Sequence, residues 1–331
     1  MSRAVTIIPG DSVGPEIAKE VMRIVESSGA KIEWDWQESG ENTLTTHGTA
    51  IPQELLDSVE RNKVALKGII NIPLESTYEL PVVTLRKSLD LYANLRPCKN
   101  IPGIDSRYDD VDIVVVRQNT QGEYTGIEHN VSPDIVEMMK VVTKEASERI
   151  ARFTFEYAVR HNRKKITTVH KANIMKLSVG LFMDTANEIA EEYPDIEHNT
   201  LIIDACCMNL VMYPEKFDVL LMGNLYGDIV SDLITGMVGG NSAVYGVNIG
   251  DNLRIFEAML GDALEKESVE KANPLPLLMS AIAMLDYLDE NAAADSIRKA
   301  ISSCLSKGIK PVYLGGEASL AEFSNSIIKL L

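Results

Sequence analysis

The chain has 331 residues, of which 45% are hydrophobic and 24% charged, a composition ordinary for a globular protein with two domains or one large α/β domain. Its net charge of −16, with no basic stripe to offset it, argues against nucleic acid or an anionic membrane as a partner. A protein this acidic can bind an acidic substrate only by concentrating its few arginines, so clustered arginines are the feature to seek.

The first residues, MSRAVTIIPGD, predict an immediate strand and no targeting leader. The longest apolar stretch, PLPLLMSAIAML, is too short to span a bilayer. The four cysteines form no C-x-x-C pair, which is typical of reduced, mostly buried thiols. We therefore expect a cytoplasmic protein.

Short apolar runs alternate with helical patterns along the chain, which predicts an α/β protein with helices packed against a sheet. Strands are predicted at 4–11, 31–39, 64–70, 112–119, 165–173, 199–211 and 217–224. Helices are predicted at 14–29, 52–63 and 223–240, as a pair over 275–305, and at the start of 84–97, which ends in an extended segment. Polar residues follow several strands, where open α/β sheets bind ligands. The chain has no G-x-G-x-x-G, so a standard Rossmann fingerprint has no support.

Two carboxylates interrupt the apolar helix predicted over GNLYGDIVSDLITGMVGG. Asp228 and Asp232 are four residues apart, so they share one helix face, and neither has a Lys or Arg within four residues. One explanation is a carboxylate near the first turn, stabilised by the helix macrodipole, beside a stray charge. The other is a shared divalent cation, which binds several carboxylate oxygens and needs a third ligand from elsewhere. We favour the cation.

Further polar residues lie at predicted strand ends or on helices. They are Arg86 and Arg96 in VTLRKSLDLYANLRP, Arg117 and Tyr124 in VVVRQNTQGEYTG, Lys171 in VHKANIMK, and Asp204 in LIIDACC. Arg86 could instead be a surface charge, Lys171 could extend its ammonium into water, and Asp204 could cap the next helix. Taken together, three arginines can bind carboxylates, three aspartates can hold Mg²⁺ or Mn²⁺, and Lys and Tyr can act as base and acid. This combination suits a hydroxy-polycarboxylate substrate.

With these residues in place, the chain resembles the β-decarboxylating dehydrogenases, the family of isocitrate, isopropylmalate and homoisocitrate dehydrogenases. The resemblance runs nearly from end to end and is specific. Its motifs are IPGDSVGPEI, LRKSLDLYANLRP, VRQNTQGEYTGIEH, VHKANIMK, NLYGDIVSDLITGMVGG, and ANP at 272–274.

The resemblance implies a mechanism. Asp204, Asp228 and Asp232 would hold Mg²⁺ or Mn²⁺ against the substrate's 2-hydroxyl and C1 carboxylate, and Arg86, Arg96 and Arg117 would hold the carboxylates. Lys171 would assist removal of the hydroxyl proton, a hydride would pass to NAD, CO₂ would leave, and Tyr124 would help protonate the resulting enolate carbon.

The resemblance also implies a fold with two interleaved α/β domains and the active site in the cleft between them. We expect a large domain formed by 1–98 and 250–331 and a small domain formed by 99–249. In this family Lys171 and Asp204 would reach the site from the partner subunit, so we expect a homodimer or a higher assembly of this chain with itself.

The segment before Arg86, YELPVVTLRK, bears on the substrate. Isocitrate enzymes typically carry Ser six and Asn four positions before this arginine, where this chain has Leu80 and Val82. Isopropylmalate enzymes place apolar residues four and three positions before it, as Val82 and Val83 are here, and a Glu seven before it, as Glu79 is here. An apolar pocket would leave a buried γ-carboxylate without a partner, at a cost of several kcal/mol.

We therefore expect 3-isopropylmalate or another 3-alkylmalate as the substrate, with Val82, Val83 and the partner's Ile174 as apolar walls. Isocitrate or homoisocitrate is the alternative, because NTQGEYTGIEH and HKANIMK resemble that branch of the family.

The cofactor segment departs from the family's pattern. LGDALEKESVEKANP, at 260–274, lacks the usual His, Pro and Ala-Gly but keeps an acidic residue, Glu265, where the family's NAD enzymes carry Asp. A carboxylate there can bind the ribose hydroxyls and repels a 2′-phosphate, so NAD is expected over NADP. The expected cofactor-binding residues are Glu79, Gly261, Glu265 and Asn273. This departure also leaves open a non-catalytic regulatory subunit, although such paralogues usually lose the metal aspartates or the arginines.

Overall fold

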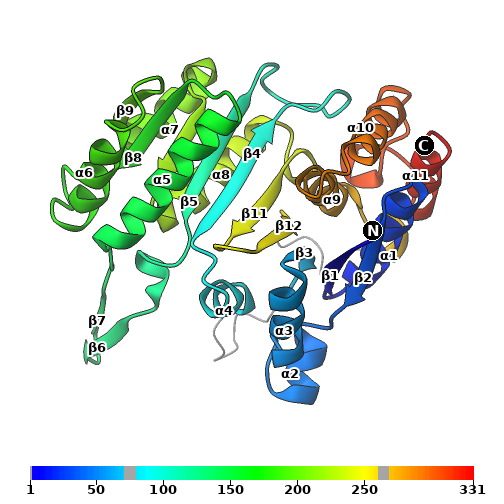
Figure 1. Cartoon of the computed structure of the whole chain (residues 1–331), viewed down its shortest axis with the longest axis horizontal. Helices are drawn as coiled ribbons and strands as arrows, with labels where there is room; N and C mark the ends of the chain where they lie inside the picture. Colours follow the sequence, from blue (N-terminus) through cyan, green and yellow to red (C-terminus); the bar gives the residue numbers. More distant parts are fainter. Residues whose placement is uncertain (1, 71–79, 260–267) are drawn as a thin grey trace. The chain divides into compact units, whose positions relative to one another are not determined.

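Two interleaved units make up the computed structural model, which describes residues 2–70, 80–259 and 268–331 (Figure 1). The first unit comprises Met1–Leu89, Asn100–Asp109 and Val238–Leu331, and the second comprises Asp90–Lys99 and Asp110–Met237. The boundaries of these units differ from those of the predicted domains. Residues 90–98 belong to the second unit and residues 238–249 to the first. The predicted domain limits stay a prediction.

A mixed sheet forms the centre of the first unit. Its strands are β1 (Arg3–Gly10), β2 (Ile32–Trp36), β3 (Val64–Ile69), β11 (Tyr245–Ile249) and β12 (Arg254–Ala258). They follow the order β2-β1-β3-β12-β11, and all neighbours are parallel except β11 and β12. β1 and β3 are buried along most of their length because helices cover both faces of this part of the sheet.

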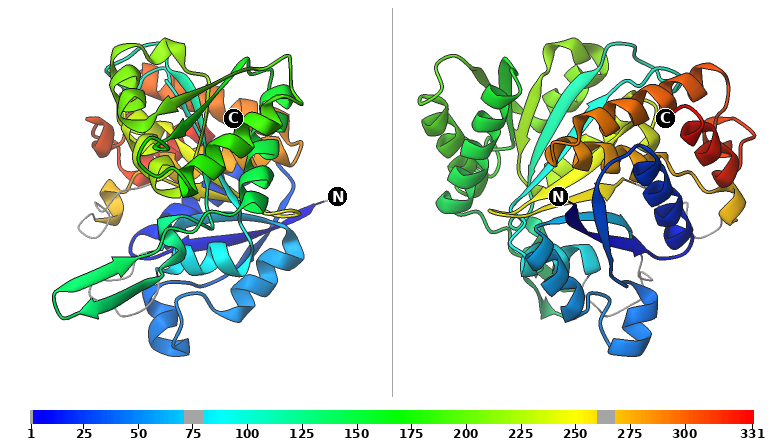
Figure 2. Two further views of the ribbon diagram at one scale, coloured as in Figure 1. Left: turned by 90° about the vertical axis from the view of Figure 1, so that its left-hand side faces the viewer. Right: turned by 45° about the vertical axis from the view of Figure 1, so that its right-hand side comes forward.

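The helices of the first unit lie in two layers. On one face α1 (Gly14–Ser27), α9 (Leu275–Tyr287), α10 (Asn291–Ser306) and α11 (Leu320–Ile328) pack on one another and on the sheet (Figures 1 and 2). On the other face α3 (Gln53–Asn62) packs on β1 and β3. α9 is buried nearly all round, which explains why its sequence is apolar without a clear stripe. α2 (Glu41–His47) and α4 (Pro81–Ser88) complete the unit's described α-helices.

The second unit has its own sheet, with the order β4-β5-β10-β8-β9. Its strands are β4 (Ala93–Lys99), β5 (Asp112–Gln118), β8 (Lys165–His170), β9 (Glu197–Ile202) and β10 (Val219–Met222). Only β4 is antiparallel to its neighbour, so the carboxyl ends of β5, β10, β8 and β9 meet at one edge. α5 (Lys144–Arg160) and α6 (Ser178–Ala190) pack on one face, and α7 (Ile203–Met212) and α8 (Asn224–Met237) on the other.

A hairpin of β6 (Glu128–Ser132) and β7 (Ile135–Met138) leaves the second unit as an exposed arm (Figure 2, left). It was not predicted, because EHNVS and IVEM lack the apolar/polar alternation of a half-buried strand, and neither face of the hairpin is buried within the chain. No helix in the described parts of the chain is long and apolar enough to cross a membrane.

Most predicted elements are confirmed, but one assignment is wrong. The segment 199–211 is not one strand, since β9 ends at Ile202 and α7 begins at Ile203, which places Asp204 in the first turn of a helix. The helix predicted from residue 84 begins three residues earlier, at Pro81, so Val82 and Val83 lie in α4.

A partly buried polar network joins β1, β2 and α3 in the first unit. The Asp35 carboxylate on β2 accepts hydrogen bonds from Ser58 Oγ at 2.6 Å, Asn62 Nδ2 at 2.9 Å and Arg61 Nη2 at 2.5 Å. Asn62 and Ser58 also contact Thr6 Oγ1 on β1, at 2.9 and 2.7 Å. Burial alone would raise the pKa of Asp35, but its hydrogen bonds, which include one from Gln37, lower it to about 2.

Asp35→Asn is expected to reduce the free energy of unfolding at pH 7 by about 1–2 kcal/mol, since it replaces a charged acceptor that has several donors. The folded-state pKa lies below the unfolded value of 3.8, so this stabilisation is present above about pH 4 and is lost as the pH falls toward 2. Urea unfolding at pH 7 and pH 3 measures it. Asp57→Asn, on the exposed face of α3, is the control and should change stability by less than about 0.5 kcal/mol. An equal loss at both pH values would contradict the network's role.

Candidate active site

Four of the predicted residues meet at the carboxyl edge of the second unit's sheet. Arg117, near the end of β5, donates through Nη1 to Asp228 Oδ1, and Arg96 Nη2 of β4 donates to the same oxygen at 3.2 Å. Arg96 Nη1 also lies 3.4 Å from Asp232 Oδ1. Both guanidinium groups are buried. Two cations and two carboxylates therefore form one cluster.

Tyr124 joins this cluster from the three-residue helix η1 (Glu123–Thr125). Its hydroxyl donates to Asp228 Oδ2 at 2.6 Å, so both oxygens of this carboxylate have donors. The guanidinium carbon of Arg117 lies 5.1 Å from the centre of the Tyr124 ring, a cation–π distance. A phenol whose O–H already faces a carboxylate is well placed to deliver a proton.

Neighbouring polar residues that the sequence did not single out orient the two arginines. Asn94 Oδ1 accepts from Arg96 Nε at 2.7 Å, and Asn224 Oδ1 accepts from Arg117 Nε at 2.9 Å. Ser231 on α8 accepts from Arg96 Nη1. These acceptors fix the planes of the guanidinium groups, which bidentate binding of a carboxylate requires.

The structure answers why two carboxylates interrupt α8. The helix begins at Asn224, so Asp228 lies past the first turn and the macrodipole explanation is weak. Cations do lie nearby, but they come from β4 and β5 rather than from the same helix. The pKa of Asp232 is raised by loss of hydration, opposed by Arg96 and reinforced by Asp228. Because 71% of this side chain is exposed, we expect the shift to be small.

α8 approaches β5 closely because residue 227 is a glycine. A Cβ atom on Gly227 would lie 2.6 Å from both Cβ and Cγ of Arg117. These atoms are at the fixed end of the arginine side chain and cannot move aside without shifting the guanidinium group. Gly227 therefore lets Arg117 reach Asp228 one residue further along the helix.

Lys171 and Asp204 form a second pair at the same edge of this sheet. Lys171 follows β8, and its Nζ lies 2.5 Å from Asp204 Oδ1 in the first turn of α7. The hydrogen bond from Lys171 lowers the pKa of the Asp204 carboxyl. Lys171 is thus bonded to a carboxylate rather than extended freely into water. Ile174 lies in the turn after β8.

The predicted metal ligands are only partly brought together within one chain. Asp228 and Asp232 share a face of α8, as predicted, and provide oxygen ligands of the kind that Mg²⁺ and Mn²⁺ bind. Among the described residues, however, no three His, Cys, Asp or Glu side chains are grouped closely enough to hold a metal ion, so Asp204 is not the third ligand within the same chain. The two helical aspartates fit a shared cation, and the third ligand is still needed from elsewhere.

Arg86 belongs to the first unit and is buried in a charged network there, so the surface-charge alternative is wrong. Its Nη2 lies 3.3 Å from Glu257 Oε1, and its Nε donates to Asn248 Oδ1 at 3.2 Å. The other oxygen of Glu257 lies 3.4 Å from the buried Lys67 ammonium, whose pKa is lowered by burial. Sequence reasoning missed Lys67 and Glu257, although a lysine inside the apolar strand VALKGII was a visible signal.

The remaining predicted residues are less informative. Val82 and Val83 lie in the first turn of α4 and are partly exposed. Asn273 is buried, with Nδ2 donating to Ser242 Oγ at 2.7 Å and Oδ1 accepting from the Leu275 amide at 3.1 Å, so it holds the start of α9. Glu79, Gly261 and Glu265 lie outside the described residues. The cofactor-binding roles of these residues and Asn273 stay predictions, as does a single site for all three arginines.

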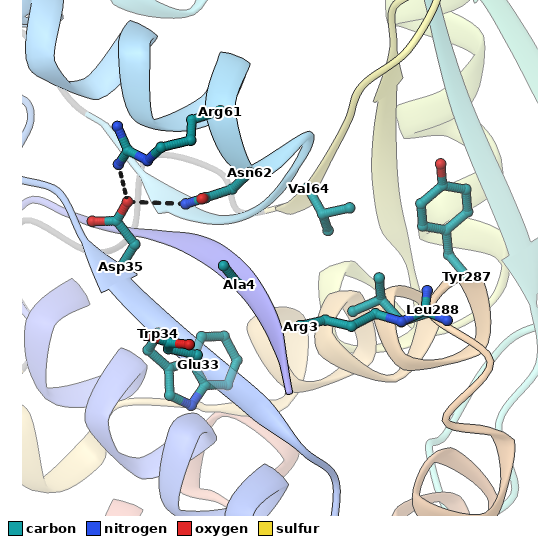
Figure 3. Close-up of a pocket in the computed structure, with 10 residues that line it drawn as sticks. All are labelled: Arg3, Ala4, Glu33, Trp34, Asp35, Arg61, Asn62, Val64, Tyr287 and Leu288. Atoms are coloured by element: carbon teal, nitrogen blue, oxygen red, sulfur yellow. Dashed lines mark hydrogen bonds and ion pairs between the residues drawn. The ribbon is translucent and has the colours of Figure 1, made fainter. Parts of the chain in front are cut away.

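A large cavity in the first unit is not a candidate active site. It has a volume of about 1030 Å³ and lies near the amino ends of β1 and β3, between Asp35, Arg61 and Asn62 on one side and Tyr287 and Leu288 on another (Figure 3). None of the predicted site residues lines it. Its Asp35 and Arg61 already pair with each other, and Arg3 lies 3.3 Å from Asp289.

Gly227→Ala is expected to displace Arg117 or α8, lowering the free energy of unfolding by about 1–3 kcal/mol, the cost of overpacking a tight contact. Gly236→Ala is the matched control, because Gly236 lies on the same helix with open space around it. The control should be neutral or stabilising by up to about 1 kcal/mol. Chemical denaturation of both variants provides the measurement, and equal stabilities would contradict the close approach of α8 and β5.

Comparisons with known proteins agree on one family. The pattern of the family described as isocitrate/isopropylmalate dehydrogenase matches residues 4–327. The chain is 45% identical over 330 residues to a regulatory subunit of mitochondrial NAD isocitrate dehydrogenase from Dictyostelium discoideum, covering 98% of this chain and 90% of that one. It is 43% identical over 324 residues to a mitochondrial catalytic subunit of NAD isocitrate dehydrogenase from Arabidopsis thaliana, covering 97% and 87%.

The crystal structure of isocitrate dehydrogenase from Methylococcus capsulatus is similar, with a TM-score of 0.94, 40% identity and 99% of each chain covered. Because several relatives are named as mitochondrial subunits, they support neither the predicted cytoplasmic location nor a homodimer, and both stay predictions. NAD and Mg²⁺ or Mn²⁺, as predicted, are the cofactors of this family. The chain belongs to the isocitrate/isopropylmalate dehydrogenase family.

Proposed function

We propose that the protein catalyses the oxidative decarboxylation of isocitrate, with NAD as the hydride acceptor. The observation that carries this proposal is the cluster in which Arg96, Arg117 and Tyr124 all contact the Asp228 carboxylate. It combines buried guanidinium groups for a polycarboxylate, an acid and half of a divalent-cation site. Its position at the carboxyl ends of parallel strands is where open α/β sheets bind ligands.

Charge balance suggests how the cluster changes when substrate binds. Asp228 serves as the counter-charge for both arginines. If Asp228 and Asp232 instead hold Mg²⁺ or Mn²⁺, Arg96 and Arg117 become available to two substrate carboxylates, which they can bind bidentately. When bound, the metal ion stabilises negative charge that develops on the substrate, and NAD accepts the hydride.

Two side chains of this chain move protons. Lys171, as the neutral amine, receives the proton of the 2-hydroxyl group as the hydride leaves C2 for NAD, and Asp204, its partner at 2.5 Å, orients the ammonium that results. After C–C bond cleavage releases CO₂, the Tyr124 hydroxyl donates a proton to the carbon that lost it. The products are 2-oxoglutarate, CO₂ and NADH.

Isocitrate replaces the expected 3-alkylmalate as the preferred substrate. The relatives are mostly named as NAD isocitrate dehydrogenase subunits, although a 3-isopropylmalate dehydrogenase of Solanum tuberosum is similar as well. The argument from Val82 and Val83 assumed that a γ-carboxylate would be buried. These valines are only partly buried, and the preceding Leu80 is 55% exposed, so a carboxylate there keeps part of its hydration.

The rival proposal is a regulatory subunit without turnover, since relatives with that name are as similar as the catalytic ones. The intact Arg96–Arg117–Asp228–Tyr124 cluster and the Lys171–Asp204 pair favour catalysis, because a subunit that only binds ligand has no need for the acid, the base and the metal aspartates together.

The turnover experiment compares kcat/KM for isocitrate, homoisocitrate, 3-isopropylmalate and D-malate with NAD and Mn²⁺. We expect isocitrate to exceed the others by about tenfold or more, that is about 1.4 kcal/mol. Asp228→Asn should abolish turnover. Preference for 3-isopropylmalate would contradict the proposal, and no turnover with any substrate would favour the regulatory role.

Leu80→Ser places a hydroxyl where isocitrate enzymes typically carry one. One added hydrogen bond to a charged group is worth about 1.5–3 kcal/mol, so kcat/KM for isocitrate should rise about tenfold or more. Leu80→Ala is the matched control, because it removes the same apolar side chain without adding a donor. Equal effects of the two substitutions would show that position 80 does not face the γ-carboxylate.

We further propose that Lys171 and Asp204 complete the site of a second copy of the chain. An exposed apolar surface lies on the segments that carry this pair and on α8, which packs on α7. It comprises Ile174, Leu177, Met208, Val211, Met212 and Ile229, from the turn after β8, α7 and α8. A site shared between two subunits requires an apolar contact surface beside the residues that one subunit contributes. Here those residues are Lys171 and Asp204, which lie apart from the Asp228 cluster.

Mixing Lys171→Ala with Asp228→Asn chains should then restore activity. Random reassortment into dimers gives one intact site in half of them, about a quarter of the parental activity. The matched control mixes Lys171→Ala with Asp204→Asn, which leaves no intact site in any pairing. Mass spectrometry should first confirm that the subunits have exchanged. If activity does not recover after that exchange, each chain supplies its own base.

A further inference from the structure

Tyr124 is carried by a segment that has little rigidity of its own. η1 spans only Glu123–Thr125 and is bounded by Gly122 and Gly126, both at positive φ, 85° and 72°. A three-residue 3₁₀ turn between two glycines can adopt many conformations, since glycine is the least restricted residue. The position of the phenol must therefore be fixed by contacts to other segments.

The segment 140–143 supplies those contacts. The backbone of Gly122 exchanges hydrogen bonds with Val141, at 2.8 and 3.3 Å. The side chain of Gln121 bonds Thr143 twice, with Nε2 donating to Oγ1 at 2.9 Å and Oε1 accepting from the amide at 2.9 Å. These bonds hold the residues before Tyr124, but not η1 itself.

Glu123 and Lys140 hold η1. Lys140 Nζ lies 2.9 Å from Glu123 Oε1, and the two side chains are only 16% and 13% exposed. The same ammonium lies 4.8 Å from the centre of the Tyr226 ring, on α8 two residues before Asp228. Glu123 Oε2 is buried and has no hydrogen-bond partner among the described residues, so Lys140 provides the main compensation for this carboxylate.

The pair spans the base of the β6–β7 arm. The chain leaves η1 for the arm at Gly126 and returns at Met139, whose amide donates to Ile127 O at 2.9 Å. The Glu123–Lys140 contact therefore joins the outgoing and returning segments, one residue from Tyr124. A cavity of about 30 Å³ lined by Lys140, Gln121, Asn224 and Tyr226 lies alongside, enough for about one water molecule and thus room for a side chain to shift.

We propose that the Glu123–Lys140 ion pair is a positioning device for Tyr124, which holds the phenol against Asp228 in the geometry that protonation of the product carbon requires. Lys140 and Glu123 act through Tyr124 and do not touch the substrate. The inference rests on the proposed function for its kinetic consequence but not for its structural one. Removing the charge of either Glu123 or Lys140 leaves the remaining charge largely buried and poorly compensated. That side chain then moves toward water and displaces η1.

The experiment compares Glu123→Gln and Lys140→Met with the parental protein. We expect kcat for isocitrate to fall about 10- to 100-fold, the scale of a small misplacement of a reacting group, while KM changes less than threefold. Lys140→Arg keeps the charge and the ring contact and should retain most of kcat. The double variant Glu123→Gln/Lys140→Met should be no worse than either single variant, because the pair acts as a unit.

Asp218→Asn is the matched control. Asp218 pairs with Arg163 at 2.9 Å, and these side chains are 22% and 21% exposed, but the pair lies at the amino end of β10, away from the cluster. It should lower the melting temperature without changing kcat more than twofold.

Amide hydrogen exchange of residues 120–126, measured on the ligand-free protein, reads the positioning directly. It should increase in Glu123→Gln and Lys140→Met but not in Asp218→Asn. The change in hydrogen exchange does not depend on turnover of isocitrate. It therefore tests the positioning role separately from the proposed function. A raised KM with unchanged kcat, or unchanged exchange in both variants, would overturn the inference.

Discussion

The shared Asp228 carboxylate is the interaction on which the second unit's site depends. Two guanidinium groups buried at the carboxyl edge of a sheet would be costly without a counter-charge, and Asp228 provides it for both while accepting the Tyr124 hydroxyl. The same carboxylate is a predicted metal ligand. If a cation binds Asp228, the arginines become available for the carboxylates of the substrate.

Backbone geometry makes this sharing possible. β4 and β5 are neighbours, so Arg96 and Arg117 reach the same edge although 21 residues separate them, and α8 starts two residues after β10 at that edge. Gly227 then allows the helix to approach the stem of Arg117, where any larger residue would separate the guanidinium group from Asp228. The chemistry of the cluster thus follows from a strand order and one missing side chain.

Periodicity and motifs predicted the α/β class, most of the strands and the helix carrying Asp228 and Asp232, because these features are local. The salt-bridge partners of those aspartates could not be predicted, since no local pattern reports which strands become neighbours. The same holds for Lys67 and Glu257, which are far apart in sequence and meet only because β3 and β12 pair. Asp204 was predicted on a strand because an apolar run continues from β9 into α7. Hydrophobic periodicity alone does not show where the strand ends and the helix begins.

The relatives favour isocitrate over the expected 3-alkylmalate, and the burial of Val82 and Val83 offers a physical reason. Two valines form an apolar wall only if they are buried where the substrate lies. Whether a residue is buried cannot be read from its type alone. Val82 and Val83 begin a helix behind the exposed Leu80, so the penalty for an unpaired γ-carboxylate is much smaller than full burial would impose. Longer motifs are better guides to the family, because a cluster such as Arg96, Arg117, Tyr124 and Asp228 works only when all its members are present in one geometry.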